Sequence, residues 1–251
     1  MGIIPDMKSF KKFIFIFLLI LVVGLASGIL YWSQSTKLPT AAALEALESE
    51  NGITVTQSKQ LIEFSNHGSP SIGFIFYPGG GIDFRSYAPQ LRLIAGEGIQ
   101  VFLLEMPLNI AFLGANRATE IIESHPEISI WAIAGHSLGG VAAAEYAANN
   151  PNIDALVLWA SYPANDKLRD RDLRVLSIYG SNDGLTTLQD IEASKVLLPE
   201  NTQFLPIDGG NHAQFGSYGL QNDDNPALLS VDQQTRQVAE ITTTFLLDLG
   251  K

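Results

Sequence analysis

The stretch that most constrains this chain is an apolar run that ends in a glycine-rich turn. Residues 128–134 read ISIWAIA and suit a strand that is buried on both faces. Gly135, His136, Ser137, Leu138 and Gly139 follow as G-x-S-x-G, and the alanine-rich residues 141–148 indicate a helix. A serine at such a turn takes a positive φ, which the small flanking glycines accommodate. We therefore expect Ser137 to project its hydroxyl between a strand end and the first N–H groups of a helix.

The pattern G-x-S-x-G also occurs by chance. The competing interpretation is a Gly/Ser helix start in some other α/β protein. What separates the two is whether the rest of the chain supplies partners for a nucleophilic serine, because a hydroxyl needs a base to take its proton.

Alternating strand and helix patterns surround this turn. Further strands are expected at residues 71–77, 100–104, 154–160, 174–179 and 203–207, and helices at 87–95, 118–124 and 230–249. Residues 53–56 and 61–64 alternate in polarity and predict an antiparallel hairpin at a sheet edge. The alternation predicts an α/β fold with a mostly parallel central sheet flanked by helices.

The N-terminal region predicts one membrane helix. Residues 13–32 are an unbroken run of apolar or small residues, about the ~20 that cross a bilayer. Three lysines precede this run, so the positive-inside bias puts the N-terminus in the cytoplasm. We expect residues 1–12 to be cytoplasmic, 13–32 to be a transmembrane anchor, 33–52 to be a linker with a stalk helix at 41–50, and 53–251 to be the folded domain. The domain would then be extracytoplasmic on a single-pass protein of the cell membrane.

A cleaved signal peptide is the alternative for the same segment. Small residues at 25–28 offer a cleavage point, and the enzyme would then be secreted. The apolar run continues past that point, whereas a cleavable apolar region usually has only ~7–15 residues. The length of the run therefore favours an uncleaved anchor.

Charge and cysteine content limit the partners. The 251 residues carry a net charge of −11, and four of the 15 basic residues lie within the first 37. The domain should therefore repel nucleic acid, so no nucleic-acid partner is expected. The chain has no cysteine, which excludes disulfides. The four histidines are not at metal-ligand spacing, and we expect neither a metal nor an organic cofactor.

A second glycine-rich loop, residues 78–81 (PGGG), follows the strand at 71–77. Its backbone N–H groups suit half of an oxyanion hole, with Gly80 as the preferred donor, while the N–H of Leu138 supplies the other half. The competing interpretation is a phosphate loop. No Gly-Lys-Ser/Thr follows and the dinucleotide spacing is absent, so nucleotide binding is rejected.

The base for Ser137 is identified by elimination among the four histidines. His136 lies within the turn itself, His67 precedes a strand, and His125 sits at the amino end of the strand at 128–134. His212 follows the last strand at its carboxyl end, where ligands bind in open α/β sheets. We therefore expect His212 to be the base.

The acid that orients His212 is expected between Ser137 and His212 in sequence, just past a strand end. Asp183 in GSNDG fits this position, although an Asp-Gly turn would also explain it. Asp208 is the alternative. It precedes His212 so closely in sequence that its carboxylate is poorly placed to turn back and reach the imidazole.

Two further segments bear on access to the site. Residues 161–173 are too few to form an inserted lid, so the site should be comparatively open. Residues 215–229 form a long irregular stretch directly after His212. This stretch either folds over the site and supplies specificity or is a plain surface loop.

The order Ser137, Asp183, His212 resembles the α/β-hydrolase superfamily over about residues 71–249. More narrowly, YPGGGID, EMPLNIA, GHSLGG, LWASYPA, YGSNDG and GGNHAQFG look like a small, lidless, membrane-anchored bacterial group sometimes compared with dienelactone hydrolases. Those enzymes have a cysteine nucleophile. The absence of cysteine here argues against a lactone substrate and leaves the expected fold unchanged.

These observations predict a serine hydrolase that cleaves a small-molecule ester or thioester through an acyl-enzyme. The alternatives are an amidase or acyltransferase with the same triad, because one nucleophile serves all three reactions. A non-catalytic, membrane-tethered binding module on the same fold is the alternative from another class.

Overall fold

The computed structural model describes residues 7–66, 68 and 70–251. The chain divides into two units, Met1–Thr36 and Lys37–Lys251. His67, one of the four histidines, lies outside the described residues.

The described residues of the first unit form helix α1 (Met7–Gln34) and a short stretch after it. Within this helix, Ile14–Gln34 is long and apolar enough to cross a membrane, with a mean hydropathy of 2.8. A membrane span and a signal sequence share these properties, so anchoring is indicated by length and composition alone.

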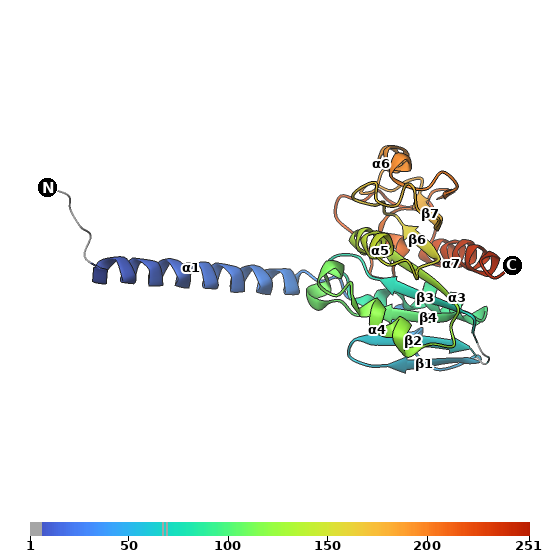
Figure 1. Cartoon of the computed structure of the whole chain (residues 1–251), viewed down its shortest axis with the longest axis horizontal. Helices are drawn as coiled ribbons and strands as arrows, with labels where there is room; N and C mark the ends of the chain where they lie inside the picture. The colour runs from blue at the N-terminus through green and yellow to red at the C-terminus, as the bar shows by residue number, and fades with distance from the viewer. Residues whose placement is uncertain (1–6, 67, 69) are drawn as a thin grey trace. The chain divides into compact units, whose positions relative to one another are not determined.

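The second unit is built on an eight-stranded sheet in the order β1-β2-β4-β3-β5-β6-β7-β8, most of which can be followed in Figure 1. The strands are β1 (Ile53–Gln57), β2 (Leu61–Asn66), β3 (Ile72–Tyr77), β4 (Gln100–Leu104), β5 (Ile130–His136), β6 (Ala155–Trp159), β7 (Arg174–Gly180) and β8 (Gln203–Ile207). The pairs β1–β2 and β2–β4 are antiparallel, and all other pairs are parallel. The predicted edge hairpin and mostly parallel sheet are confirmed.

Helices cover both faces of this sheet. They are α2 (Ala41–Glu45), α3 (Ala88–Gly96), α4 (Arg117–Ser124), α5 (Leu138–Asn149), α6 (Leu188–Ser194) and α7 (Val231–Asp248), with short 3-10 helices η1 (Phe84–Tyr87), η2 (Pro107–Asn109), η3 (Ala111–Leu113), η4 (Lys195–Leu197) and η5 (Ala213–Phe215). Each face of the sheet has its own hydrophobic core, and alternate residues of β3 point into one or the other. Phe74 and Phe76 pack with α3 and α7, whereas Ile75 and Tyr77 pack with α4 and α5. The predicted α/β class is therefore correct.

The segment before β1 differs from the expected stalk. Helix α2 covers only five residues, and the side chains of Ala43 and Leu47 are buried in the domain. Arg92 of α3 donates hydrogen bonds to the carbonyls of Ala46, Glu48 and Glu50. A helix this short is not stable alone, and its apolar residues pack into the core instead. The compact unit therefore begins at Lys37 rather than at residue 53.

The parallel register brings one set of strand ends together. Tyr77 pairs with Gly135, His136 with Trp159, and Gly180 with Ile207. The carboxyl ends of β3, β5, β6, β7 and β8 thus lie along the same edge of the sheet. The predicted site residues follow four of these strands, β3, β5, β7 and β8.

Candidate active site

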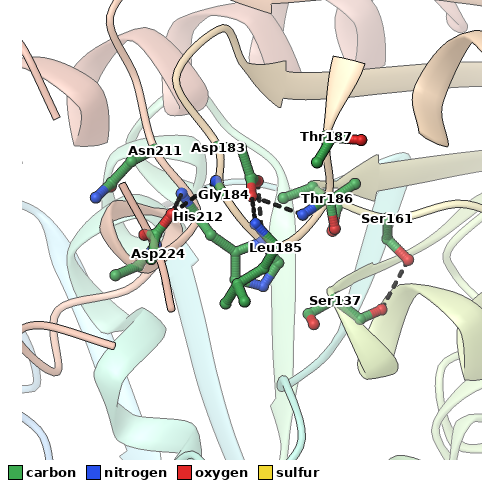
Figure 2. A network of polar contacts seen from close by, with 12 residues as sticks. Ser137, Ser161, Asp183, Gly184, Leu185, Thr186, Thr187, Asn211, His212 and Asp224 are labelled. Atoms are coloured by element: carbon green, nitrogen blue, oxygen red, sulfur yellow. Dashed lines mark hydrogen bonds and ion pairs between the residues drawn. The ribbon is translucent and has the colours of Figure 1, made fainter. Parts of the chain in front are cut away.

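Ser137 occupies the turn between β5 and α5. Its φ of 51° and ψ of −123° are strained for a residue with a side chain. A Cβ on Gly139 would collide with the carbonyl oxygens of Tyr77 and Pro78, so only glycine permits this approach to the end of β3. The Ser137 carbonyl accepts a hydrogen bond from Ser161 Oγ at 2.7 Å, which ties the turn to the end of β6 (Figure 2).

The glycine-rich loop after β3 lies against the start of α5. The Gly79 N–H donates to Tyr87 Oη (3.0 Å) and the Gly81 N–H donates to the Asn109 carbonyl (2.9 Å). Within the described residues the Gly80 N–H has no such partner. A Cβ placed on Gly80 would lie 3.0 Å from Leu138 Cδ2, so the two predicted oxyanion donors belong to neighbouring residues.

Asp183 lies in the loop after β7 and is buried. Its Oδ1 accepts hydrogen bonds from the N–H groups of Leu185 (2.8 Å) and Thr186 (2.7 Å). Its Oδ2 lies 2.9 Å from His212 Nδ1. One carboxylate oxygen is thus held by the backbone while the other is directed at the imidazole (Figure 2). This arrangement orients the ring and favours the tautomer with its proton on Nδ1.

His212, in the loop after β8, is 1% exposed. Its backbone is held by a residue that sequence reasoning did not identify. Asp224 accepts hydrogen bonds from the N–H groups of Gly184 (3.0 Å), His212 (3.4 Å) and Ala213 (2.8 Å). Asp224 therefore joins the acid loop to the histidine loop. Through Asp224, the segment at residues 215–229 packs on both loops.

The structure brings Asp183 and His212 into contact but not His212 and Ser137. Within the described part of the chain, no hydrogen bond joins Ser137 Oγ to the imidazole of His212. Catalytic hydrogen bonds in unliganded enzymes are often long and tighten when substrate binds. The alternative acid, Asp208, is exposed and makes no side-chain hydrogen bond to another described residue.

The remaining described histidines differ in their relation to the site. His125 caps the end of α4, bonded to the Ile121 carbonyl (2.8 Å), and lies at the opposite end of the sheet as expected. His136 is fully buried, and its ring centroid lies 4.5 Å from that of His212. His136 is thus part of the serine turn, as the sequence indicates, and its ring also packs on that of the predicted base.

A small cleft of about 260 Å³ opens beside Ser137. Its lining is uncharged: Ser137, Leu138, Val141, Ala160, Ser161, Tyr162, Leu185 and Thr186. A larger groove of about 470 Å³ runs between α3 and α7, remote from these loops, so size alone does not identify the site. Among residues 7–66, 68 and 70–251, no group of three His, Asp or Glu side chains is arranged to hold a metal ion.

Several solved structures share this fold. Est1E from Butyrivibrio proteoclasticus aligns with a TM-score of 0.56 at 14% identity, over 78% of this chain and 100% of that one. Thermogutta terrifontis esterase 2 aligns with a TM-score of 0.58 at 15% identity, over 81% and 97%. A predicted CIB-like hydrolase from Thermoplasma acidophilum aligns with a TM-score of 0.58 at 11% identity, over 77% and 100%.

Two comparisons of the sequence were informative in different ways. No curated protein matches the chain. The sequence model described as the alpha/beta hydrolase family matches residues 73–236, which is more than half of the chain. The protein therefore belongs to the alpha/beta hydrolase family.

Proposed function

We propose that this protein is a serine hydrolase that cleaves a small-molecule carboxylic ester or thioester through Ser137, His212 and Asp183. The observation that carries the proposal is the buried Asp183–His212 pair, with 2.9 Å between Oδ2 and Nδ1. This pair lies on the same sheet edge as Ser137, whose strained turn exposes a hydroxyl beside the first N–H groups of α5. A buried carboxylate that fixes the tautomer of a histidine is the arrangement that activates a serine.

The reaction follows from the roles of these groups. Ser137 Oγ attacks the carbonyl carbon while His212 Nε2 takes the hydroxyl proton, and Asp183 stabilises the resulting imidazolium. The N–H groups of Leu138 and Gly80 would hold the tetrahedral oxyanion. His212 then returns the proton to the departing alcohol or thiol. Water, deprotonated by His212, attacks the acyl-enzyme and releases the acid together with free Ser137.

The structural neighbours are consistent with an ester substrate. One solved structure has ferulic acid bound to Est1E, and others show Thermogutta terrifontis esterase 2 phosphoramylated by tabun or with propionate bound. The uncharged lining of the cleft beside Ser137 suits a neutral acyl or alcohol group.

Location is part of the proposal. Helix α1 would anchor the protein in the cell membrane as a single span, with the catalytic unit on the extracytoplasmic side. The apolar length of Ile14–Gln34 and the lysines before it support this arrangement.

Labelling with a fluorophosphonate, combined with kinetics on matched nitrophenyl ester, thioester and anilide substrates, tests the chemistry. Wild-type protein should be labelled at Ser137 and turn over the ester. Ser137→Ala should lose labelling and lose roughly 10³-fold or more in kcat while keeping its melting temperature. A folded Ser137→Ala protein that retained activity would remove the central claim. Wild-type protein that neither reacts nor turns over any substrate would favour a binding module, and preference for the anilide would favour an amidase.

A further inference from the structure

Tyr87 and His136 form a buried polar connection between the glycine-rich loop and the serine turn. Both side chains are fully buried. Tyr87 Oη accepts a hydrogen bond from the Gly79 N–H at 3.0 Å and lies 2.9 Å from His136 Nδ1. A Cβ on Gly79 would lie 2.9 Å from both Tyr87 Oη and His136 Nδ1, so glycine is required for this contact.

The direction of the protons follows from the number of partners. The Tyr87 hydroxyl has one hydrogen, and these two groups are its only hydrogen-bond partners among the described residues. Because the Gly79 N–H can only donate, the hydroxyl hydrogen must go to His136 Nδ1 or remain unbonded in the core. Donation to Nδ1 leaves one group among the described residues without a partner, the N–H on Nε2, whereas the opposite direction leaves both the hydroxyl hydrogen and Nε2 unbonded. Unpaired buried polar groups are costly, so Tyr87 donates to Nδ1 and the proton of His136 is on Nε2.

From this arrangement we infer that Tyr87 and His136 are positioning residues for the proposed reaction, and that they hold the loop of residues 78–81 so that the Gly80 N–H stays directed at the oxyanion. The backbone N–H groups on either side of Gly80 are hydrogen-bonded. The Gly79 N–H donates to Tyr87 Oη, and the Gly81 N–H donates to the Asn109 carbonyl. With both neighbours fixed, the peptide that carries the Gly80 N–H cannot turn freely. The inference rests on the proposed function.

The same connection keeps positive charge away from the base. Burial and the nearby His212 lower the pKa of His136 well below its ordinary value, although the backbone of His212 acts weakly in the opposite direction. Within the part of the chain that the structure describes, no hydrogen bond of normal geometry reaches His136 Nε2. A neutral His136, with its ring centroid 4.5 Å from that of His212, leaves His212 free to become the imidazolium that the reaction requires.

Tyr87→Phe is the direct test, because it removes only the hydroxyl and keeps the ring that packs on Phe76. On a soluble nitrophenyl ester we expect kcat to fall about 10- to 100-fold, somewhat less than the ~10²–10³-fold cost of deleting an oxyanion donor outright. KM should stay within about twofold, as expected for a contact made only in the transition state. Affinity for phenyl trifluoromethyl ketone, whose serine adduct carries an oxyanion, should fall in parallel with kcat/KM.

Tyr146→Phe is the matched control. This change removes the hydroxyl of another buried tyrosine, which is bonded to Thr119 Oγ1 at 2.8 Å. Within the described residues, no hydrogen bond joins that hydroxyl to the glycine-rich loop. We expect a comparable loss in melting temperature but kcat and ketone affinity within about twofold of wild type. Equal losses of kcat in Tyr87→Phe and Tyr146→Phe would overturn the inference, because they would indicate general destabilisation.

His136→Asn provides a second route if Tyr87→Phe fails to fold. It should show the same split between kcat and KM, and the double variant should lose no more than the more impaired single variant, because the two residues act as one connection. Additive losses, or an effect on KM alone, would overturn the inference while leaving Ser137 labelling and the proposed function intact. A wild-type protein without Ser137 labelling would overturn both.

Discussion

Two aspartates near His212 differ in their surroundings. Asp183 is buried, accepts two backbone hydrogen bonds on Oδ1, and reaches His212 with Oδ2. Asp208 is exposed, and within the described residues its side chain makes no hydrogen bond to the imidazole. A carboxylate can hold a tautomer only through direct contact, so the difference in environment separates the two candidates that the sequence proposed.

Exchange of each aspartate for asparagine tests this assignment. Asp183→Asn should lower kcat by about 10⁴-fold at neutral pH, because the amide no longer favours the required tautomer of His212. Asp208→Asn should change kcat less than about twofold. Steady-state kinetics on one ester, with melting temperatures as the control for folding, give the comparison. The reverse ranking would make Asp208 the acid.

His136 makes stability depend on pH. The folded pKa lies well below the ordinary value of 6.5 because burial disfavours the charged ring. As pH falls below about 6.5, the unfolded chain therefore binds a proton that the folded protein does not, and stability decreases. Well above that pH, His136 does not lower the free energy of unfolding. Below it, the free energy of unfolding decreases progressively as the pH falls. Melting temperature should fall more steeply from pH 7 to 5 in wild type than in His136→Asn, and parallel curves would contradict this account.

The site residues predicted from the sequence share a local signature, whereas Tyr87 and Asp224, which the sequence did not indicate, lack one. Ser137, Asp183 and His212 each follow a strand at its carboxyl end, so topology alone brought them to one edge. Tyr87 and Asp224 act through contacts with residues distant in sequence: Tyr87 meets His136 49 positions away, and Asp224 meets Gly184 40 positions away. No spacing rule encodes such contacts, because they depend on how separate loops pack.

Among the elements, those with clear periodicity were predicted well and short ones were not. Helix α7 begins where the sequence predicts it, with a capping box of Ser230 and Gln233. Helix α6 was missed, although Thr187 and Asp190 form a capping box that marks its start. Helix α2 ends at Glu45, although helical composition continues to residue 50, and Ala43 and Leu47 pack into the core. Tertiary packing decides such short segments.

The irregular segment between η5 and α7 also has a structural role. Its Asp224 carboxylate holds the N–H groups of the acid loop and the histidine loop together. Further contacts run from Asn211 Nδ2 to the Asn225 carbonyl (2.8 Å) and from the Leu228 N–H to the Gly209 carbonyl (2.7 Å). The segment thus holds the loops that carry Asp183 and His212 in place through hydrogen bonds.

Asp224→Asn should weaken that support. An amide presents one acceptor and one donor, so at least one backbone N–H group loses its partner, at a cost of about 1–3 kcal/mol. We expect a lower melting temperature and a several-fold (~3–10) lower kcat, since small misplacement of catalytic groups reduces the rate. Asp223→Asn is the matched control, because Asp223 is exposed and asparagine tolerates its φ of 66°. Equal effects of the two changes would deny Asp224 this role.

For the whole molecule, the boundary between the two units fixes where the catalytic unit begins. The Lys37 N–H donates to the Gly81 carbonyl at 2.8 Å, and the Asp83 N–H donates to the Lys37 carbonyl at 2.9 Å. Residues 39–52 continue along the same unit, with Ala43 and Leu47 buried. Most of the linker predicted at residues 33–52 is therefore structured, and only residues 35 and 36 separate α1 from Lys37.

Proteinase K added to intact cells or spheroplasts should cleave near this boundary if α1 is an uncleaved anchor with the catalytic unit outside. Cleavage needs accessible chain that can unfold locally. Residues 39–52 resist such unfolding, because Ala43 and Leu47 are buried in the core and Arg92 holds the carbonyls of Ala46, Glu48 and Glu50. Mass spectrometry should therefore place the new N-terminus of the released fragment between about residues 33 and 39, and the fragment should keep its activity on a soluble ester. Cleavage within residues 41–52 would instead support the accessible stalk predicted from the sequence. Complete protection of intact cells, with cleavage only after lysis, would place the unit in the cytoplasm, and an untreated mature protein that begins near residue 27 would show that α1 is a signal peptide.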